Sequence, residues 1–123
     1  MKLHNVKYTV ILPLWLILAY SRHGSASASL PVEQMRPVVQ DSFKTADPGT
    51  RDAALKVVDD AQNNDIATAF VEVDKLASRR DLTPEQQAAV LRVRRTIQKQ
   101  LVEAADKGDA RATQALAHFR ATR

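Results

Sequence analysis

A helix start signal in the middle of the chain constrains the fold more than any other feature of the sequence. Thr83 can cap a helix, Pro84 suits the first helical position, and Gln86 can return a hydrogen bond to the backbone of Thr83. Apolar residues then recur every three or four positions, at Val90, Val93, Ile97, Leu101, Ala104 and Ala105. Gly108 is a typical helix stop. The spacing predicts an amphipathic helix from residue 84 to about residue 107.

Similar start and stop signals divide the neighbouring sequence into four more helices. We predict helices over residues 37–46, 50–63, 66–80 and 110–121. Pro37 is expected at the first position of the earliest helix. Either Asp47 or Thr50 caps the second, Asp65 caps the third, and Asp109 caps the last. No segment alternates polar and apolar residues in the manner of a strand, so the prediction is an all-α fold.

The connections between the predicted helices are short, and this limits the topology. Links of two or three residues are expected around Asn64, before Thr83 and at Gly108. Such links favour antiparallel packing of consecutive helices. We therefore predict a small antiparallel bundle of two α-hairpins, at 50–80 and 83–121, stacked with the short leading helix.

The first 28 residues have the organisation of a secretory signal peptide. Two lysines precede a 13-residue apolar run, and a small polar stretch containing Ala26, Ser27 and Ala28 follows it. The run is shorter than the roughly 20 residues that a permanent membrane helix needs. We predict cleavage before Ser29. Cleavage in a frame set by Ser25 or Ala26, and retention of the segment as a membrane anchor, are the alternatives. Export to the periplasm or the cell exterior follows from this prediction.

The predicted mature chain divides into a flexible segment at residues 29–36 and a helical domain at 37–123. It is nearly neutral, with 15 basic and 14 acidic residues, but residues 29–78 carry a net charge of −4 and residues 79–123 a net charge of +5. Phe43, Phe70 and Phe119 are its only aromatic residues. The low net charge and the lack of interleaved aromatic residues argue against nucleic acid as a partner.

Few residues of the mature sequence could carry chemistry. It has no cysteine and one histidine, His118, for which a solvent-facing place near a helix end is expected. The acidic residues around Asp59 and Asp60 lack the spacing and terminal glutamate of a calcium-binding loop. We therefore predict no catalytic site, no metal site and no cofactor.

The segment from Ala104 to Leu116 resembles the junction between the two helices of a Sel1-like repeat, a relative of the tetratricopeptide repeat. In both, an Ala-Ala pair precedes a Gly, an Ala follows four residues later, and a Leu four residues after that. Asn64–Ala69 is similar to the tetratricopeptide turn. The chain departs from the repeats in having no Trp or Tyr at the signature positions and in placing Ala117 where Gly is favoured. The resemblance implies protein–protein binding or scaffolding without catalysis.

Arg92, Arg95 and Lys99 form a basic stripe on the long helix, which is the candidate partner-binding surface of the sequence. Their spacing places them along one face, where a solvated surface is the alternative interpretation. An apolar groove between the two hairpins is the other candidate surface. The predicted function is an exported, non-catalytic module that binds or scaffolds another protein. A periplasmic inhibitor or chaperone-like protein and an unrecognised small hydrolase are the alternatives.

Overall fold

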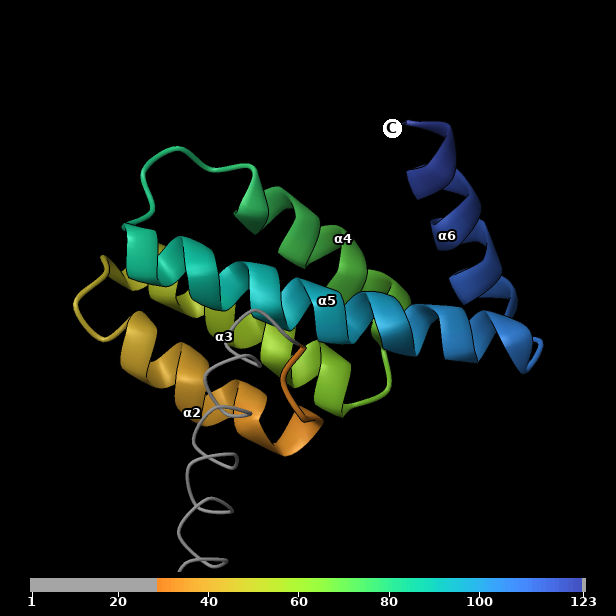
Figure 1. Cartoon of the computed structure of the whole chain (residues 1–123), viewed down its shortest axis with the longest axis horizontal. Helices are drawn as coiled ribbons and strands as arrows, with labels where there is room; N and C mark the ends of the chain where they lie inside the picture. Colours follow the sequence, from red (N-terminus) through yellow and green to blue (C-terminus); the bar gives the residue numbers. More distant parts are fainter. Residues whose placement is uncertain (1–28, 123) are drawn as a thin grey trace, which may run out of the picture.

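The computed structural model describes residues 29–122, and most of them are helical (Figure 1). The helices are α2 (Val32–Ser42), α3 (Pro48–Gln62), α4 (Ile66–Ala77), α5 (Pro84–Asp106) and α6 (Ala110–Ala121). The part of the chain that the structure describes contains no strand, so the predicted all-α class is confirmed. The predicted signal peptide lies outside the described residues.

Helices α2 to α5 form a four-helix bundle. The chain reverses direction from each helix to the next (Figure 1), and α2 packs against both α3 and α5, which in turn both pack against α4. The leading helix thus closes a ring of four helices, whereas the sequence predicts it stacked with two hairpins. This ring explains why α2 forms: its apolar face covers a core that three helices alone would leave open.

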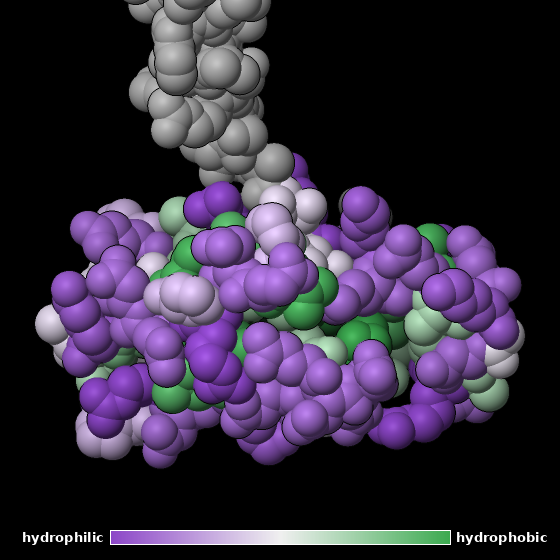
Figure 2. All heavy atoms as spheres, turned by 90° about the horizontal axis from the view of Figure 1, so that it is seen from below, coloured by the Kyte–Doolittle hydropathy of each residue, from purple (hydrophilic) through white to green (hydrophobic). Residues whose placement is uncertain are grey.

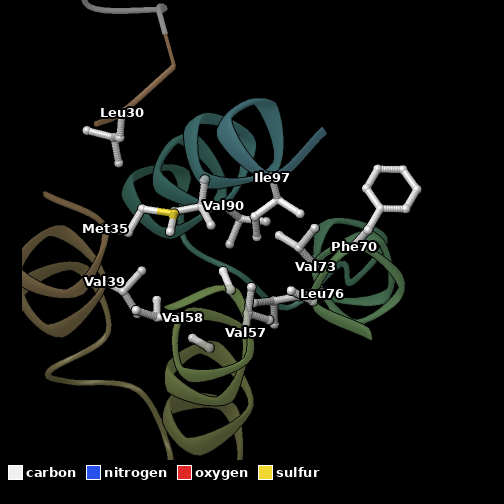
Figure 3. Close-up of a cluster of buried hydrophobic side chains, with 14 of the residues drawn as sticks. Leu30, Met35, Val39, Val57, Val58, Phe70, Val73, Leu76, Val90 and Ile97 are labelled. Carbon is white, nitrogen blue, oxygen red and sulfur yellow. The ribbon is translucent and has the colours of Figure 1, made fainter. Parts of the chain in front are cut away.

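The core fills the centre of this ring with closely packed aliphatic side chains (Figure 3). Side chains that are completely buried come from each of the four helices: Met35, Val58, Val73 and Ile97. Leu30, in the segment before α2, also lies against the core and is 6% exposed. Phe70 differs from the others, because its ring points away from the centre of the cluster (Figure 3).

The predicted start of the first helix at Pro37 is wrong. Helix α2 begins at Val32 and carries Pro37 in its interior. A proline there cannot donate a hydrogen bond to the carbonyl of Glu33, but both residues are exposed and water can hydrate that carbonyl. The earlier start brings Met35 into the core, where its burial offsets the lost hydrogen bond. Local sequence preference is therefore overridden by packing.

Three of the four predicted caps are confirmed, whereas the side chain of Asp65 makes no capping hydrogen bond at the start of α4. Thr83 and Gln86 form the reciprocal capping box at the start of α5, with N···O distances of 3.1 and 3.0 Å. Asp47, and not Thr50, caps α3, because its carboxylate accepts from the backbone N–H of Thr50 at 3.0 Å and from its hydroxyl at 2.7 Å. These two hydrogen bonds hold the pKa of Asp47 below its usual value. Asp109 caps α6 as expected.

The link between α4 and α5 is longer than predicted. Helix α4 ends at Ala77 and not near Arg80, which leaves six residues before α5 begins. Ser78 ends the helix by donating its hydroxyl to the carbonyl of Asp74 at 2.9 Å. Arg79 then makes two hydrogen bonds to Asp81, at 3.0 and 2.7 Å, and these lower the pKa of Asp81.

Helix α6 stands outside the four-helix ring. Gly108, with φ of 93°, turns the chain after α5, and α6 then leaves α5 at a steep angle instead of returning along it (Figure 1). It packs on α5 and, at fewer positions, on α4. Polar side chains cover most of the molecule when it is seen from below, with apolar side chains visible only in the gaps between them (Figure 2).

Candidate functional site: a groove beside helix α4

A groove of about 780 Å³ runs beside α4. Its walls come from α3 and α6, and α4 supplies half of the residues that line it. The groove exists because α6 leaves α5 steeply, so that α6 and α3 flank α4 without covering it. The predicted apolar groove lay between two hairpins, whereas this groove is lined by α3, α4 and α6 and by no residue of α5.

Small and apolar side chains form the floor of the groove. Ala53 of α3, Ala67 and Val71 of α4, and Ala115 of α6 all line it. Val71 is 45% exposed and, with Leu91, is one of two large hydrophobic residues that the described part of the chain leaves exposed. Because alanine side chains project little, a partner backbone can approach these helices closely.

Charged side chains surround this floor, and most of them are basic. Lys75, Arg79, Arg111 and His118 line the groove together with one acid, Glu72. Glu72 already accepts a hydrogen bond from Lys56 of α3 at 2.8 Å. That bond, with a second from Lys56 to Asp60 at 2.9 Å, raises the pKa of the Lys56 ammonium above its usual range. Glu72 therefore shares the ammonium of Lys56 with Asp60, and its negative charge is only partly offset within the domain.

The basic side chains differ in how strongly the domain engages them. Arg79 is held by Asp81, as described above. Arg111 donates to the hydroxyl of Thr68 at 3.1 Å and lies 3.4 Å from a carboxylate oxygen of Asp65. Lys75 forms no ion pair with any residue of the described range. The groove thus offers at least one ammonium group, that of Lys75, that is not paired with a carboxylate of the described residues.

Contacts on the far side of α6 fix the wall of the groove. The ring of Phe119 meets that of Phe70 edge to face, with the ring centroids 5.1 Å apart. The guanidinium of Arg94 lies 5.5 Å from the centroid of Phe119 and forms an ion pair with Asp74 at 2.8 Å. These residues, which we call the α6 latch, join α6 to both α4 and α5. The outward direction of Phe70 is explained by this contact.

The predicted basic stripe lies elsewhere. Arg92, Arg95 and Lys99 are on α5, which does not line the groove, and Arg95 and Lys99 are exposed. Lys99 lines a smaller hollow of about 370 Å³ beside the segment that precedes α2. In this hollow the hydroxyl of Thr96 donates to the carbonyl of Leu30. The stripe therefore stays a prediction, separate from the groove.

Sequence reasoning missed Val71, Lys75 and Arg111 as possible binding residues. Val71 lies off the apolar stripe that buries α4, and Ala67 precedes it by one helical turn. An apolar pair on the polar side of a helix is a detectable signal for a second contact surface. Lys75 and Arg111 carry no such signal, because charged residues are common on exposed helix faces.

The acidic residues around Asp59 and Asp60 are engaged in ion pairs. Asp59 pairs with Arg36 and Asp60 with Lys56. Across residues 29–122, no group of three or more His, Cys, Asp or Glu side chains is arranged to hold a metal ion. His118 is exposed and lines the groove. Within the same range, no helix combines the length and the apolar character needed to span a membrane.

No protein-family model, no curated protein and no solved structure matches this chain. The geometry of the groove and the chemistry of its lining are accordingly the basis for the functional proposal.

Proposed function

We propose that this protein is an exported, non-catalytic module that binds another protein in the groove beside α4. The observation that carries the proposal is Val71, an aliphatic side chain left 45% exposed on the floor of a groove of about 780 Å³. Exposed apolar surface within a concave, polar-rimmed site is typical of interaction surfaces. The resemblance to tetratricopeptide and Sel1-like repeats is in keeping with this role.

The chain offers a matched control for testing the groove. Leu91, on α5, is 46% exposed and does not line the groove. A glutamate at either position is solvated to a similar degree, so the two substitutions differ chiefly in location. Both variants should show unchanged helical circular dichroism.

The test is a pull-down from the envelope fraction of the exporting cell with tagged wild-type protein and the two variants. We expect a stoichiometric partner with the wild type and with Leu91→Glu, and loss of that partner with Val71→Glu. Retention by folded Val71→Glu would contradict a binding role for the groove. Reversal of Arg92, Arg95 and Lys99 to glutamate, tested in parallel, shows whether the basic stripe contributes.

Export is the second part of the proposal and depends on the signal peptide. The Ala26-Ser27-Ala28 sequence supports cleavage before Ser29. Leu30 is the first described side chain buried in the core, so cleavage at this position removes no buried residue of the described domain. Mass spectrometry of the exported protein should give the mass of a chain that begins at or near Ser29. A mass that includes Met1 would contradict cleavage.

A further inference from the structure

We propose that the occupant of the groove is a single amphipathic helix whose apolar face is bordered by aspartate or glutamate side chains. This inference rests on the proposed function, because it names the chemistry of the partner for the same groove. It follows from the shape of the groove, the small size of its floor residues and the charges on its rim.

The floor of the groove has the dimensions of a short helix. Ala67, Val71 and Lys75 follow one another at intervals of one turn and therefore lie along one line on α4. Between Ala67 and Lys75 the rise is about 12 Å, at about 1.5 Å per residue. A partner helix of roughly two turns matches this length.

The floor favours a helix over an extended peptide. An extended segment gains affinity by pairing its backbone with the free edge of a sheet, and the described residues contain no strand. A helix satisfies its own backbone and needs only a surface for its side chains. Ala53, Ala67 and Ala115 provide such a surface on three helices, with Val71 available to pack against apolar residues of the partner.

The rim selects an acidic partner. Glu72, the one acid that lines the groove, is already paired with Lys56, whereas Lys75 has no ion pair among the described residues. The Arg111 side chain is 69% exposed, and besides its hydrogen bond to Thr68 it has one ion pair, with Asp65 at 3.4 Å, which is too exposed to hold it strongly. Carboxylates on a partner can therefore pair with Lys75 and Arg111, while a basic helix would meet like charges.

The test is a selection of random displayed peptides of roughly 16 residues. The bait is the immobilised protein as the exporting cell processes it, with counter-selection on its Val71→Glu variant. We expect enrichment of peptides with apolar residues at helical spacing and more Asp and Glu than Lys and Arg. Enriched peptides that are basic, or that lack helical spacing, would overturn the inference, as would the absence of any enrichment.

Synthetic copies of the selected peptides then test the charge pairing directly. Binding should weaken by about tenfold or more on Val71→Glu or when a proline replaces a central residue, and should be unchanged on Leu91→Glu. Lys75→Glu should weaken the binding of an acidic peptide. It should strengthen the binding of a copy in which lysine replaces the acidic residues. If Lys75→Glu leaves both copies unaffected, the proposed charge pairing is wrong.

The two proposals fail in different ways. If the cellular partner depends on Val71 but the selected peptides are basic or not helical, the groove is a protein-binding site and the inferred partner chemistry is wrong. If the Val71→Glu variant captures the cellular partner as well as the wild type does, the proposed function itself fails.

Discussion

The four-helix ring of α2 to α5 and the single helix α6 differ in how they are held. Each helix of the ring packs against two neighbours and contributes completely buried side chains. Helix α6 has two buried residues, Ala112 and Leu116, and is otherwise held by the α6 latch and by the exposed contacts of Arg111 with Thr68 and Asp65. The ring therefore supplies most of the stability of the domain. Helix α6 forms a wall of the groove and has a lower local stability than the ring.

This difference suggests why binding and stability can be separated in so small a protein. A helix packed on all sides leaves no concave surface, whereas a helix that leaves the bundle steeply creates one. Leu76 is the one groove residue that is buried in the core, so the other groove residues can change without unfolding the ring. The predictions below test this separation, beginning with the largest effect.

Truncation of a ring residue should destabilise the whole domain. Ile97 is completely buried, so Ile97→Ala removes packed atoms and leaves a cavity, at an expected cost of about 2 to 5 kcal/mol. Thermal unfolding followed by circular dichroism should show a large fall in the midpoint. An unchanged midpoint would mean that the ring is not the stabilising unit.

Truncation in α6 should act mainly on α6. Leu116 is 7% exposed, and Leu116→Ala should cost about 2 kcal/mol of local stability. We expect faster amide hydrogen exchange throughout α6 and little change in α2 to α4. Equal acceleration in every helix would show that α6 and the ring unfold as one unit.

Removal of the capping box should have an intermediate effect on both regions. Thr83→Ala leaves the Gln86 N–H without its acceptor and should cost about 1 kcal/mol. For a domain of this size the midpoint should fall by about 4 to 8 °C. Because α5 belongs to the ring and also packs against α6, amide hydrogen exchange should become faster in the ring and in α6. Acceleration confined to α6 would contradict the shared role of α5.

The smallest expected effect concerns the exposed cap of α3. Asp47 has a folded pKa below its unfolded value, which is about 3.9, because Thr50 donates two hydrogen bonds to its carboxylate. The charged form thus contributes stability above the unfolded pKa, and this is lost as the pH falls through the folded pKa. Asp47→Asn should lower the midpoint slightly at pH 7, and the difference should disappear near pH 2. A difference that grows toward low pH would contradict this assignment.

The sequence predicted those parts of the fold that depend on neighbouring residues. The capping box at Thr83 and the stop at Gly108 are both local, and both occur as expected. The start of α2 was not predictable in this way, because it depends on Met35 reaching a core built by distant helices. There, burial outweighs the local preference of Pro37.

The groove was less predictable than the fold. Its width depends on the angle at which α6 leaves α5, and that angle is held by the α6 latch. The latch joins Phe70, Arg94 and Phe119, which lie far apart in the sequence. Periodicity identifies the inward faces of single helices but does not give the angle between two of them. The off-stripe position of Val71 was the only local sign of the groove.

Site-specific photo-crosslinking in the exporting cell tests the central claim most directly. A photoreactive residue would replace Val71 or Gln114, which line the groove from α4 and α6, or Leu91 as the control on α5. The account predicts the same discrete protein adduct from positions 71 and 114 and none from position 91. A discrete adduct from position 91 alone, or the absence of any adduct from both groove positions, would contradict it.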